Sequence, residues 1–166
     1  MDAAEVVRVL DAIDAAGVDW GITGGWGIDA LLRRETRSHG DLDLGVASEA
    51  VDDAIDALEP LGYVLVRDDR PARVVLTSDV GQVDLHPIVW GPAGAGVQTG
   101  LAGETFEYPT GSLDAEGEIG GRLVRCGTPE LQVAFHSEYE PRDHDRRDLE
   151  ALGAEFGLSL PAAYLD

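Results

Sequence analysis

The chain has one cysteine, no lysine and no long apolar run. Cys126 is its only cysteine, so no intrachain disulfide can form, and a cytoplasmic location is the default expectation. No stretch of about 18 apolar residues occurs, so no membrane-spanning helix is predicted. The first residues, Met1 to Glu5, are acidic and lack an apolar segment, so we do not expect a secretory signal. The 166 residues are enough for one domain with its own core.

Cationic residues are also scarce. All 12 are Arg, against 32 Asp plus Glu, and the formal net charge is −20. This balance argues against nucleic acid as a partner, because neutralising phosphates requires a basic face, and it disfavours anionic membrane surfaces. It indicates a heavily solvated acidic surface, or a composition shaped by a high-salt cytoplasm or a GC-rich genome. A bound nucleotide would need local cations: a metal, Arg side chains or helix N-termini.

The apolar spacing predicts an α/β fold, a mixed β-sheet flanked by helices, with further helices at the C-terminus. We expect a single domain over residues 1–166, with a core at about 18–126 and a helical segment at about 128–158. Predicted helices cover about 3–16, 26–34, 48–59 and 141–156, with another starting at Thr128-Pro129. Predicted strands cover about 19–23, 41–46, 63–67, 73–77, 82–88 and 122–126. Ser48 is the expected N-cap of its helix, and 91–121 is expected to be a long loop with one short strand near 105–108.

Two aspartates at alternate positions are the most informative feature. Asp41 and Asp43 alternate with Leu42 and Leu44. Alternate residues of a strand share a face, so the leucines can enter the core while both carboxylates point the other way. Two anions this close cost energy unless a cation lies between them, and a divalent metal is the usual cation in such sites.

A third carboxylate follows the same rule. Asp84 alternates with Val83 and Leu85, so it projects away from its apolar neighbours. If its strand lies beside that of Asp41 and Asp43, three carboxylates converge on one patch. With one or two Mg²⁺ ions such a patch is suited to phosphoryl or nucleotidyl transfer, with one carboxylate accepting the proton of an attacking hydroxyl.

Gly24 and Gly25 lie between a predicted strand and a predicted helix. Backbone N–H groups of such a turn can face phosphate oxygens, and the absent Cβ atoms allow close approach. Each of these features also occurs alone in strands and turns that have no catalytic role. Their combination is what indicates a transfer site. His86 shares the face of Asp84 and either serves the acceptor or forms a structural hydrogen bond.

These residues resemble a known family. Gly24-Gly25-Trp26, Asp29, Thr36-Arg37, His39 and Asp41-x-Asp43 are similar to the motif of the antibiotic nucleotidyltransferases. The groups in question are the lincosamide nucleotidyltransferases and the aminoglycoside 2″-adenylyltransferases, of the polymerase-β-like superfamily. The stretch 83–87 resembles the strand that carries the third carboxylate there, and the resemblance covers roughly 18–150.

The resemblance implies Mg²⁺-dependent transfer of a nucleotidyl group from a nucleoside triphosphate, expected to be ATP, to a hydroxyl of a small molecule such as an aminoglycoside or lincosamide. It implies that Asp41, Asp43 and Asp84 are the catalytic, metal-binding residues, with Asp84 as ligand, general base or both. The implied nucleotide-binding residues are Gly24, Gly25, Trp26, Arg37 and His39. Among them the glycines would cradle phosphates, Trp26 would help to seat its helix, and Arg37 and His39 would lie beside the phosphates or the acceptor. Asp29 would anchor the Arg-rich link.

Other interpretations remain open at this point. The charged stretch 136–148 is either a solvated helix with ion pairs or an acidic wall for a cationic acceptor, formed by Glu138, Glu140, Asp145 and Asp148. The alternatives to a small-molecule transferase are a nucleotide-binding module, a protein-modifying nucleotidyltransferase of toxin–antitoxin type, and a structural acidic protein. Chain length and the resemblance together suggest a homodimer that closes the acceptor side.

Overall fold

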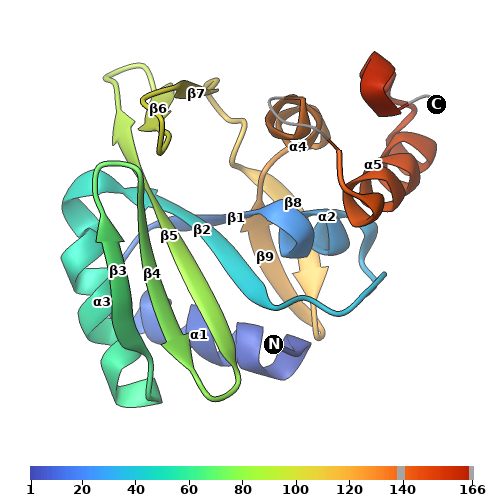
Figure 1. Ribbon diagram of the computed structural model, residues 1–166. Coiled ribbons are helices and arrows are strands. Elements are labelled where there is room, and N and C mark those ends of the chain that lie inside the picture. The colour runs from blue at the N-terminus through green and yellow to red at the C-terminus, as the bar shows by residue number, and fades with distance from the viewer. Residues whose placement is uncertain (138–140, 165–166) are drawn as a thin grey trace.

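The structure, a computed structural model, describes residues 1–137 and 141–164. Its centre is a mixed β-sheet in the order β3-β4-β5-β2-β1-β9-β8, with β6 and β7 attached to the end of β5 (Figure 1). The strands are β1 (Trp20–Thr23), β2 (Asp41–Ala47), β3 (Val64–Asp69), β4 (Arg73–Ser78), β5 (Gly81–Trp90), β6 (Gly96–Thr99), β7 (Thr105–Tyr108), β8 (Ala115–Ile119) and β9 (Arg122–Cys126). The predicted α/β class is confirmed.

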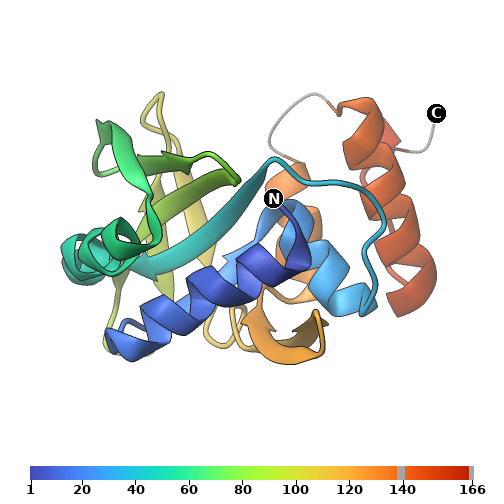
Figure 2. The ribbon, with the colours of Figure 1, turned by 90° about the horizontal axis from the view of Figure 1, so that it is seen from below.

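Helices flank this sheet. They are α1 (Ala3–Ala15), α2 (Gly24–Leu32), α3 (Val51–Leu58), α4 (Pro129–His136) and α5 (Asp143–Phe156), with short 3₁₀ helices at Ser48–Ala50, Glu59–Leu61 and Ala162–Tyr164. Helices α1 and α3 pack side by side, while α2, α4 and α5 group at the other end of the molecule, near β8 and β9 (Figures 1 and 2). Within the described ranges, no helix is long and apolar enough to cross a membrane.

The core follows the alternation read from the sequence. Leu42 and Leu44 of β2 and Val83 and Leu85 of β5 are fully buried, in one cluster with the apolar side of α1. Because successive side chains of a strand point to opposite faces, Asp41, Asp43 and Asp84 are directed to the other face. Apolar burial on one side of the sheet therefore places the acidic residues on the opposite side.

The expectation of a long loop over 91–121 with one short strand is wrong in extent. The short strand is present as β7, but β6 and β8 are strands as well. Their glycines conceal them, since apolar alternation needs side chains. Gly117 of β8, for example, lies so close to the backbone of Ala30 that a Cβ would be 2.7 Å from its carbonyl oxygen. Close packing against α2 takes the place of apolar alternation there.

Three helix starts also differ from expectation. Ser48 is not the N-cap of α3: it begins a 3₁₀ helix, and its hydroxyl donates to the Glu49 carboxylate at 3.1 Å. Gly24 and Gly25 are the first residues of α2 rather than a separate turn, although Gly24 has a left-handed φ of +62°. Helix α5 begins at Asp143, two residues after the predicted start. Helix starts depend on which groups satisfy the first N–H donors, and that is decided by tertiary neighbours.

A second, smaller core lies on the acidic face of the sheet, further along the strands. It consists of Ile88, Tyr108, Leu113 and Leu131. Leu113 occupies the space over Gly21, where a Cβ would overlap its side chain. This cluster fastens the β6–β7 hairpin and α4 beside the carboxylates.

Candidate active site

Strands β2 and β5 are parallel neighbours, and their register brings the acidic residues together. Asp43 pairs with Asp84, Asp41 with Gln82, and Gly45 with His86. The three carboxylates singled out in the sequence therefore lie on one face of two adjacent strands. Asp84 is buried, Asp43 is partly buried and Asp41 is exposed, so the group runs from the interior to solvent.

Asp84 is 3% exposed, and its carboxylate has two partners. Gln82 Nε2 donates to its Oδ1 at 2.6 Å, and Arg73 Nη1 donates to its Oδ2 at 3.1 Å. Burial raises the pKa of Asp84 above its ordinary value, the negative charge of Asp43 raises it further, and the Gln82 hydrogen bond opposes the rise. Asp84 is thus a carboxyl group that holds a proton more strongly than an ordinary aspartate.

Asp43 lies between a histidine and the start of α2. Its Oδ1 is 2.9 Å from His86 Nε2. On its other side, a Cβ on Gly24 would overlap Asp43 Oδ2. Gly24 therefore allows the carboxylate to approach the positive N-terminal end of the helix, a role that sequence reasoning assigned only to phosphate approach.

The rest of the motif forms a buried support around Asp29. This carboxylate accepts from the backbone N–H of Thr36 at 3.1 Å and from its hydroxyl at 2.6 Å, and it lies 2.5 Å from His39 Nε2. The ring of Trp26 is tilted against that of His39, with centroids 4.7 Å apart. The expected anchoring of the Arg-rich link by Asp29 is confirmed. Trp26 and His39 are both buried, so in this conformation they pack beneath the surface of the site and do not face solvent.

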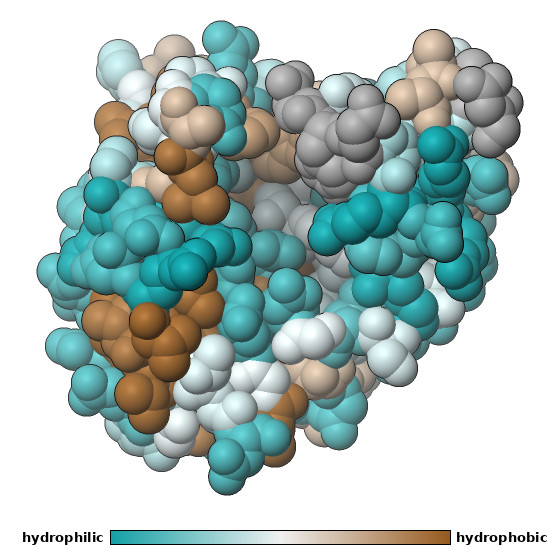
Figure 3. Space-filling view, viewed as in Figure 1, coloured by the Kyte–Doolittle hydropathy of each residue, from teal (hydrophilic) through white to brown (hydrophobic). Residues whose placement is uncertain are grey.

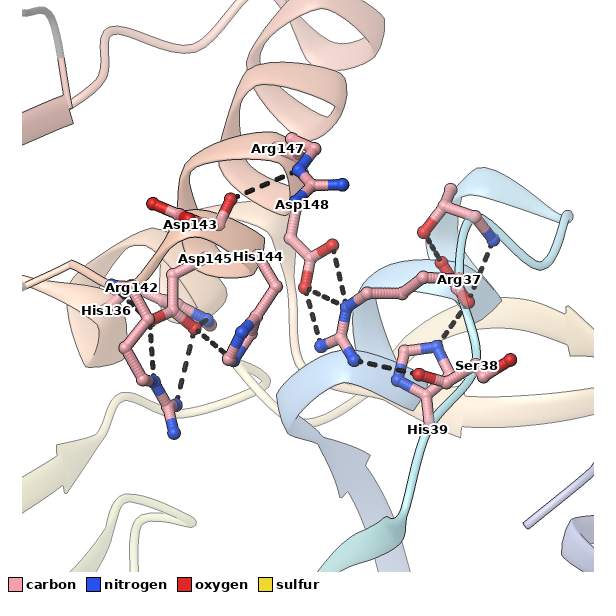
Figure 4. Close-up of polar contacts among 12 residues, drawn as sticks. Arg37, Ser38, His39, His136, Arg142, Asp143, His144, Asp145, Arg147 and Asp148 are labelled. Atoms are coloured by element: carbon pink, nitrogen blue, oxygen red, sulfur yellow. Dashed lines mark hydrogen bonds and ion pairs between the residues drawn. The ribbon is translucent and has the colours of Figure 1, made fainter.

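Arg37 and Gly25 are neighbours at the surface of this support. A Cβ on Gly25 would be 2.7 Å from Arg37 Nη2 and 2.5 Å from His39 Nδ1. Arg37 itself forms a two-pronged ion pair with Asp148 of α5, Nε to Oδ2 at 3.0 Å and Nη2 to Oδ2 at 2.8 Å (Figure 4). Residues 111 positions apart in the chain thereby tie α5 to the motif.

The acidic residues of the C-terminal stretch are engaged with cations of the protein. Asp145 accepts from Arg142 Nε at 3.0 Å and from its backbone N–H at 2.9 Å, and His144 Nε2 lies 3.4 Å away (Figure 4). Asp148 holds Arg37. Both carboxylates are ion-paired, as one interpretation expected, but both are buried, so the expectation of a solvated helix face is wrong for them. Glu138 and Glu140, the other members of the predicted acidic wall, lie outside the described residues.

Several polar residues at the site were not found by sequence reasoning. Gln82 lies two positions before Asp84 and was detectable from the same alternation. Arg73 of β4 and Gln98 of β6 reach the site only through strand pairing and a folded-back hairpin, for which the local sequence carries no signal. Gln98 donates to His86 at 3.0 Å, so the structural hydrogen bond expected for His86 as one of two options is present.

The donor set suits a hard divalent cation. Among residues 1–137 and 141–164, no three His, Cys, Asp or Glu side chains form a ready-made ligand cluster. Asp43 and Asp84 nevertheless lie opposite each other, and their repulsion contributes to the raised pKa of Asp84. A cation between them would relieve that repulsion, and carboxylate oxygens are the ligands that Mg²⁺ prefers. The surface is hollowed between the β6–β7 side and the α4–α5 side (Figure 3).

Comparison with known proteins decides the family. The family model described as aminoglycoside-2''-adenylyltransferase matches residues 5–152. The chain belongs to this family. It is therefore a nucleotidyltransferase, and the enzyme class predicted from the sequence is confirmed.

Individual members of the family agree with this assignment over nearly the whole chain. A lincosamide resistance protein from Staphylococcus haemolyticus is 28% identical over 149 residues, covering 89% of this chain and 92% of that protein. A 2''-aminoglycoside nucleotidyltransferase from Escherichia coli is 31% identical over 182 residues, covering 99% and 97%. The crystal structure of the lincosamide antibiotic adenylyltransferase LnuA with lincomycin bound superposes with a TM-score of 0.79 at 28% identity, covering 91% of this chain and 96% of that one.

Proposed function

We propose that this enzyme transfers a nucleotidyl group from ATP to a hydroxyl of an aminoglycoside or lincosamide in a Mg²⁺-dependent reaction. The observation that carries the proposal is the β2–β5 register, which sets Asp43 opposite Asp84 next to the start of α2. Relatives named as a 2''-aminoglycoside nucleotidyltransferase and a lincosamide antibiotic adenylyltransferase support the choice of acceptor.

Asp41, Asp43 and Asp84 are the residues that would hold Mg²⁺. Asp43 and Asp84 already face each other, and the exposed Asp41 is one step further along the same face of β2. When bound, the ion supplies positive charge against the polyphosphate oxygens. The pairing of Asp43 with Asp84 across two adjacent strands supports this assignment, because it brings two oxygen-bearing side chains onto neighbouring positions of one face.

We expect Asp84 to act also as the general base. Its raised pKa gives its carboxylate a stronger hold on a proton than an ordinary aspartate has. The hydroxyl oxygen of the acceptor forms a bond to the α-phosphorus, and the bond from that phosphorus to the bridging oxygen breaks. The hydroxyl proton passes to Asp84 Oδ, and pyrophosphate leaves. Gln82 and Arg73 orient the carboxylate for this step.

The triphosphate would lie at the start of α2. The backbone N–H groups of Gly24 and Gly25 are at the positive end of the helix dipole, where anions are favoured. Arg37 is partly exposed beside Gly25, and we expect it to contact phosphate oxygens. Trp26 and His39 act beneath it by fixing the link that carries Arg37.

The test is a labelling experiment. The protein is incubated with ATP labelled at the α-phosphate, with Mg²⁺ and a panel of aminoglycosides and lincosamides. With the wild type, we expect label on an antibiotic and release of an equimolar amount of pyrophosphate. With Asp43→Asn, we expect no more labelled antibiotic than in a reaction without enzyme. The matched control Asp53→Asn removes one exposed carboxylate from α3 and should keep wild-type activity. Label on protein, label on no acceptor, or an active Asp43→Asn variant would contradict the proposal.

A further inference from the structure

A line of hydrogen bonds runs from Asp43 into the smaller core. His86 Nε2 lies 2.9 Å from Asp43 Oδ1, Gln98 Nε2 lies 3.0 Å from His86 Nδ1, and the Tyr108 hydroxyl donates to Gln98 Oε1 at 2.8 Å. The four residues come from β2, β5, β6 and β7, so the line crosses from the central sheet to the hairpin. The motif and the proposed chemistry account only for Asp43.

The line has a direction. Tyr108 donates to the amide oxygen of Gln98, which turns the amide nitrogen toward His86. An amide nitrogen is only a donor, so His86 Nδ1 must accept, and a neutral imidazole then carries its proton on Nε2. That proton is donated to Asp43. The hairpin thus selects one tautomer of His86 and makes it a hydrogen-bond donor to the carboxylate.

The far end of the line is rigid. Tyr108 is 1% exposed, and its ring meets those of Phe135 and Trp90 edge to face, with centroids 5.0 and 6.0 Å away. Burial raises the pKa of Tyr108, so its hydroxyl keeps its proton and remains a donor. Gln98 is buried as well. A donor held this firmly imposes an orientation on the group at the other end of the line.

We propose that His86, Gln98 and Tyr108 are positioning residues that orient the Asp43 carboxylate for its cation. His86 engages Oδ1, which leaves Oδ2, beside Gly24, for the ion. The glycine-rich hairpin thereby acts as a support for the metal site. The inference rests on the proposed function in one respect, namely that the ion held by Asp43 is Mg²⁺.

The tautomer is tested without any metal. Nitrogen-15 NMR of protein labelled at histidine reports which ring nitrogen carries the proton, and His86→Gln assigns the signal among the four histidines. We expect a protonated Nε2 and an unprotonated Nδ1 in the wild type, with this preference lost in Tyr108→Phe. A proton on Nδ1 of His86 in the wild type, or a signal that Tyr108→Phe leaves unmoved, would overturn the proposal.

The consequence for the cation is tested with Mn²⁺, whose binding is followed by electron paramagnetic resonance. Partners that orient metal ligands typically contribute 10–100-fold in affinity, so His86→Leu should weaken Mn²⁺ binding by about that factor. His86→Gln, which retains a donor near the Nε2 position, should recover most of the lost Mn²⁺ affinity. The affinity of Tyr108→Phe should lie between those of the wild type and His86→Leu. Circular dichroism checks that each variant is folded.

Tyr63→Phe is the matched control. Tyr63 is also 1% exposed, and its hydroxyl donates to a carboxylate, that of Glu5, at 2.8 Å, but on the α1 side of the molecule. The Tyr63→Phe variant should bind Mn²⁺ with the affinity of the wild type. Wild-type affinity in folded His86→Leu would overturn the positioning role. If the wild type bound no Mn²⁺ at all, the proposed function would fail, whereas the NMR result would still decide the hydrogen-bond line.

Discussion

At the scale of single residues, the buried carboxyl of Asp84 reduces the stability of the fold when it is ionised. Its carboxyl is buried against another aspartate, and both burial and the charge of Asp43 raise its pKa. Between the unfolded and folded pKa values of such a group, the folded state binds more protons than the unfolded state. Stability is therefore lost as the pH rises through that window.

Asp84→Asn should remove this penalty. Without divalent cations, the variant's free energy of unfolding minus that of the wild type should be near zero below about pH 4, the ordinary range of an aspartate, and should grow as the pH rises. Urea unfolding across the pH range measures it, and each kcal/mol gained corresponds to about 2–4 °C in Tm for a chain of this size. Asp53→Asn, which is exposed, should show a flat difference. A variant less stable than the wild type at neutral pH would contradict the argument.

At the scale of elements, the Arg37–Asp148 ion pair joins α5 to the motif. Asp148 is 3% exposed, whereas the Arg37 side chain is 31% exposed. The two partners are therefore not equivalent. Removing Arg37 leaves a charge buried without its partner, while removing Asp148 leaves a cation that water can reach.

Arg37→Met should therefore destabilise the protein more than Asp148→Asn. We expect about 3–5 kcal/mol for the first and about 1–3 kcal/mol for the second in urea unfolding. In both variants, amide hydrogen exchange should accelerate in α5 and stay slow in α1, which packs beside α3 rather than against the Arg37–Asp148 pair. Equal losses of unfolding free energy in the two variants, or unchanged amide hydrogen exchange in α5, would show that the ion pair does not hold the helix.

Prediction from sequence succeeded where a short pattern contains its own physical cause. The alternation of Asp41 and Asp43 with leucines required one apolar and one acidic face, and the structure has both. It failed where glycines replace side chains, as in β6 and β8. It also missed Arg73 and Gln98, because their places at the site follow from strand pairing across long loops.

At the scale of the whole molecule, the charge of −20 is the dominant feature. Self-repulsion of this size destabilises a compact state, and salt screens it over a Debye length of about 10 Å at 0.1 M. We expect the Tm to rise with KCl concentration from low salt toward molar salt. Scanning calorimetry measures the rise, and KCl is preferable to a sulfate salt, which would also strengthen apolar burial. A flat response would reject both the repulsion argument and an adaptation to a high-salt cytoplasm. The predicted homodimer stays a prediction.

The sequence by itself determined which side chains face the core, which three aspartates share a face of their strands, and which family motif they belong to. The first two follow from backbone geometry and local spacing alone, and the third from the resemblance of its residues to the family motif. Only the tertiary structure decided that β5 lies beside β2 in a register that opposes Asp43 and Asp84, that α5 closes on Arg37, and that a hairpin supports His86. These arrangements depend on contacts between segments that are distant in the sequence. Such contacts form only when the whole chain is packed, so no local pattern reveals them.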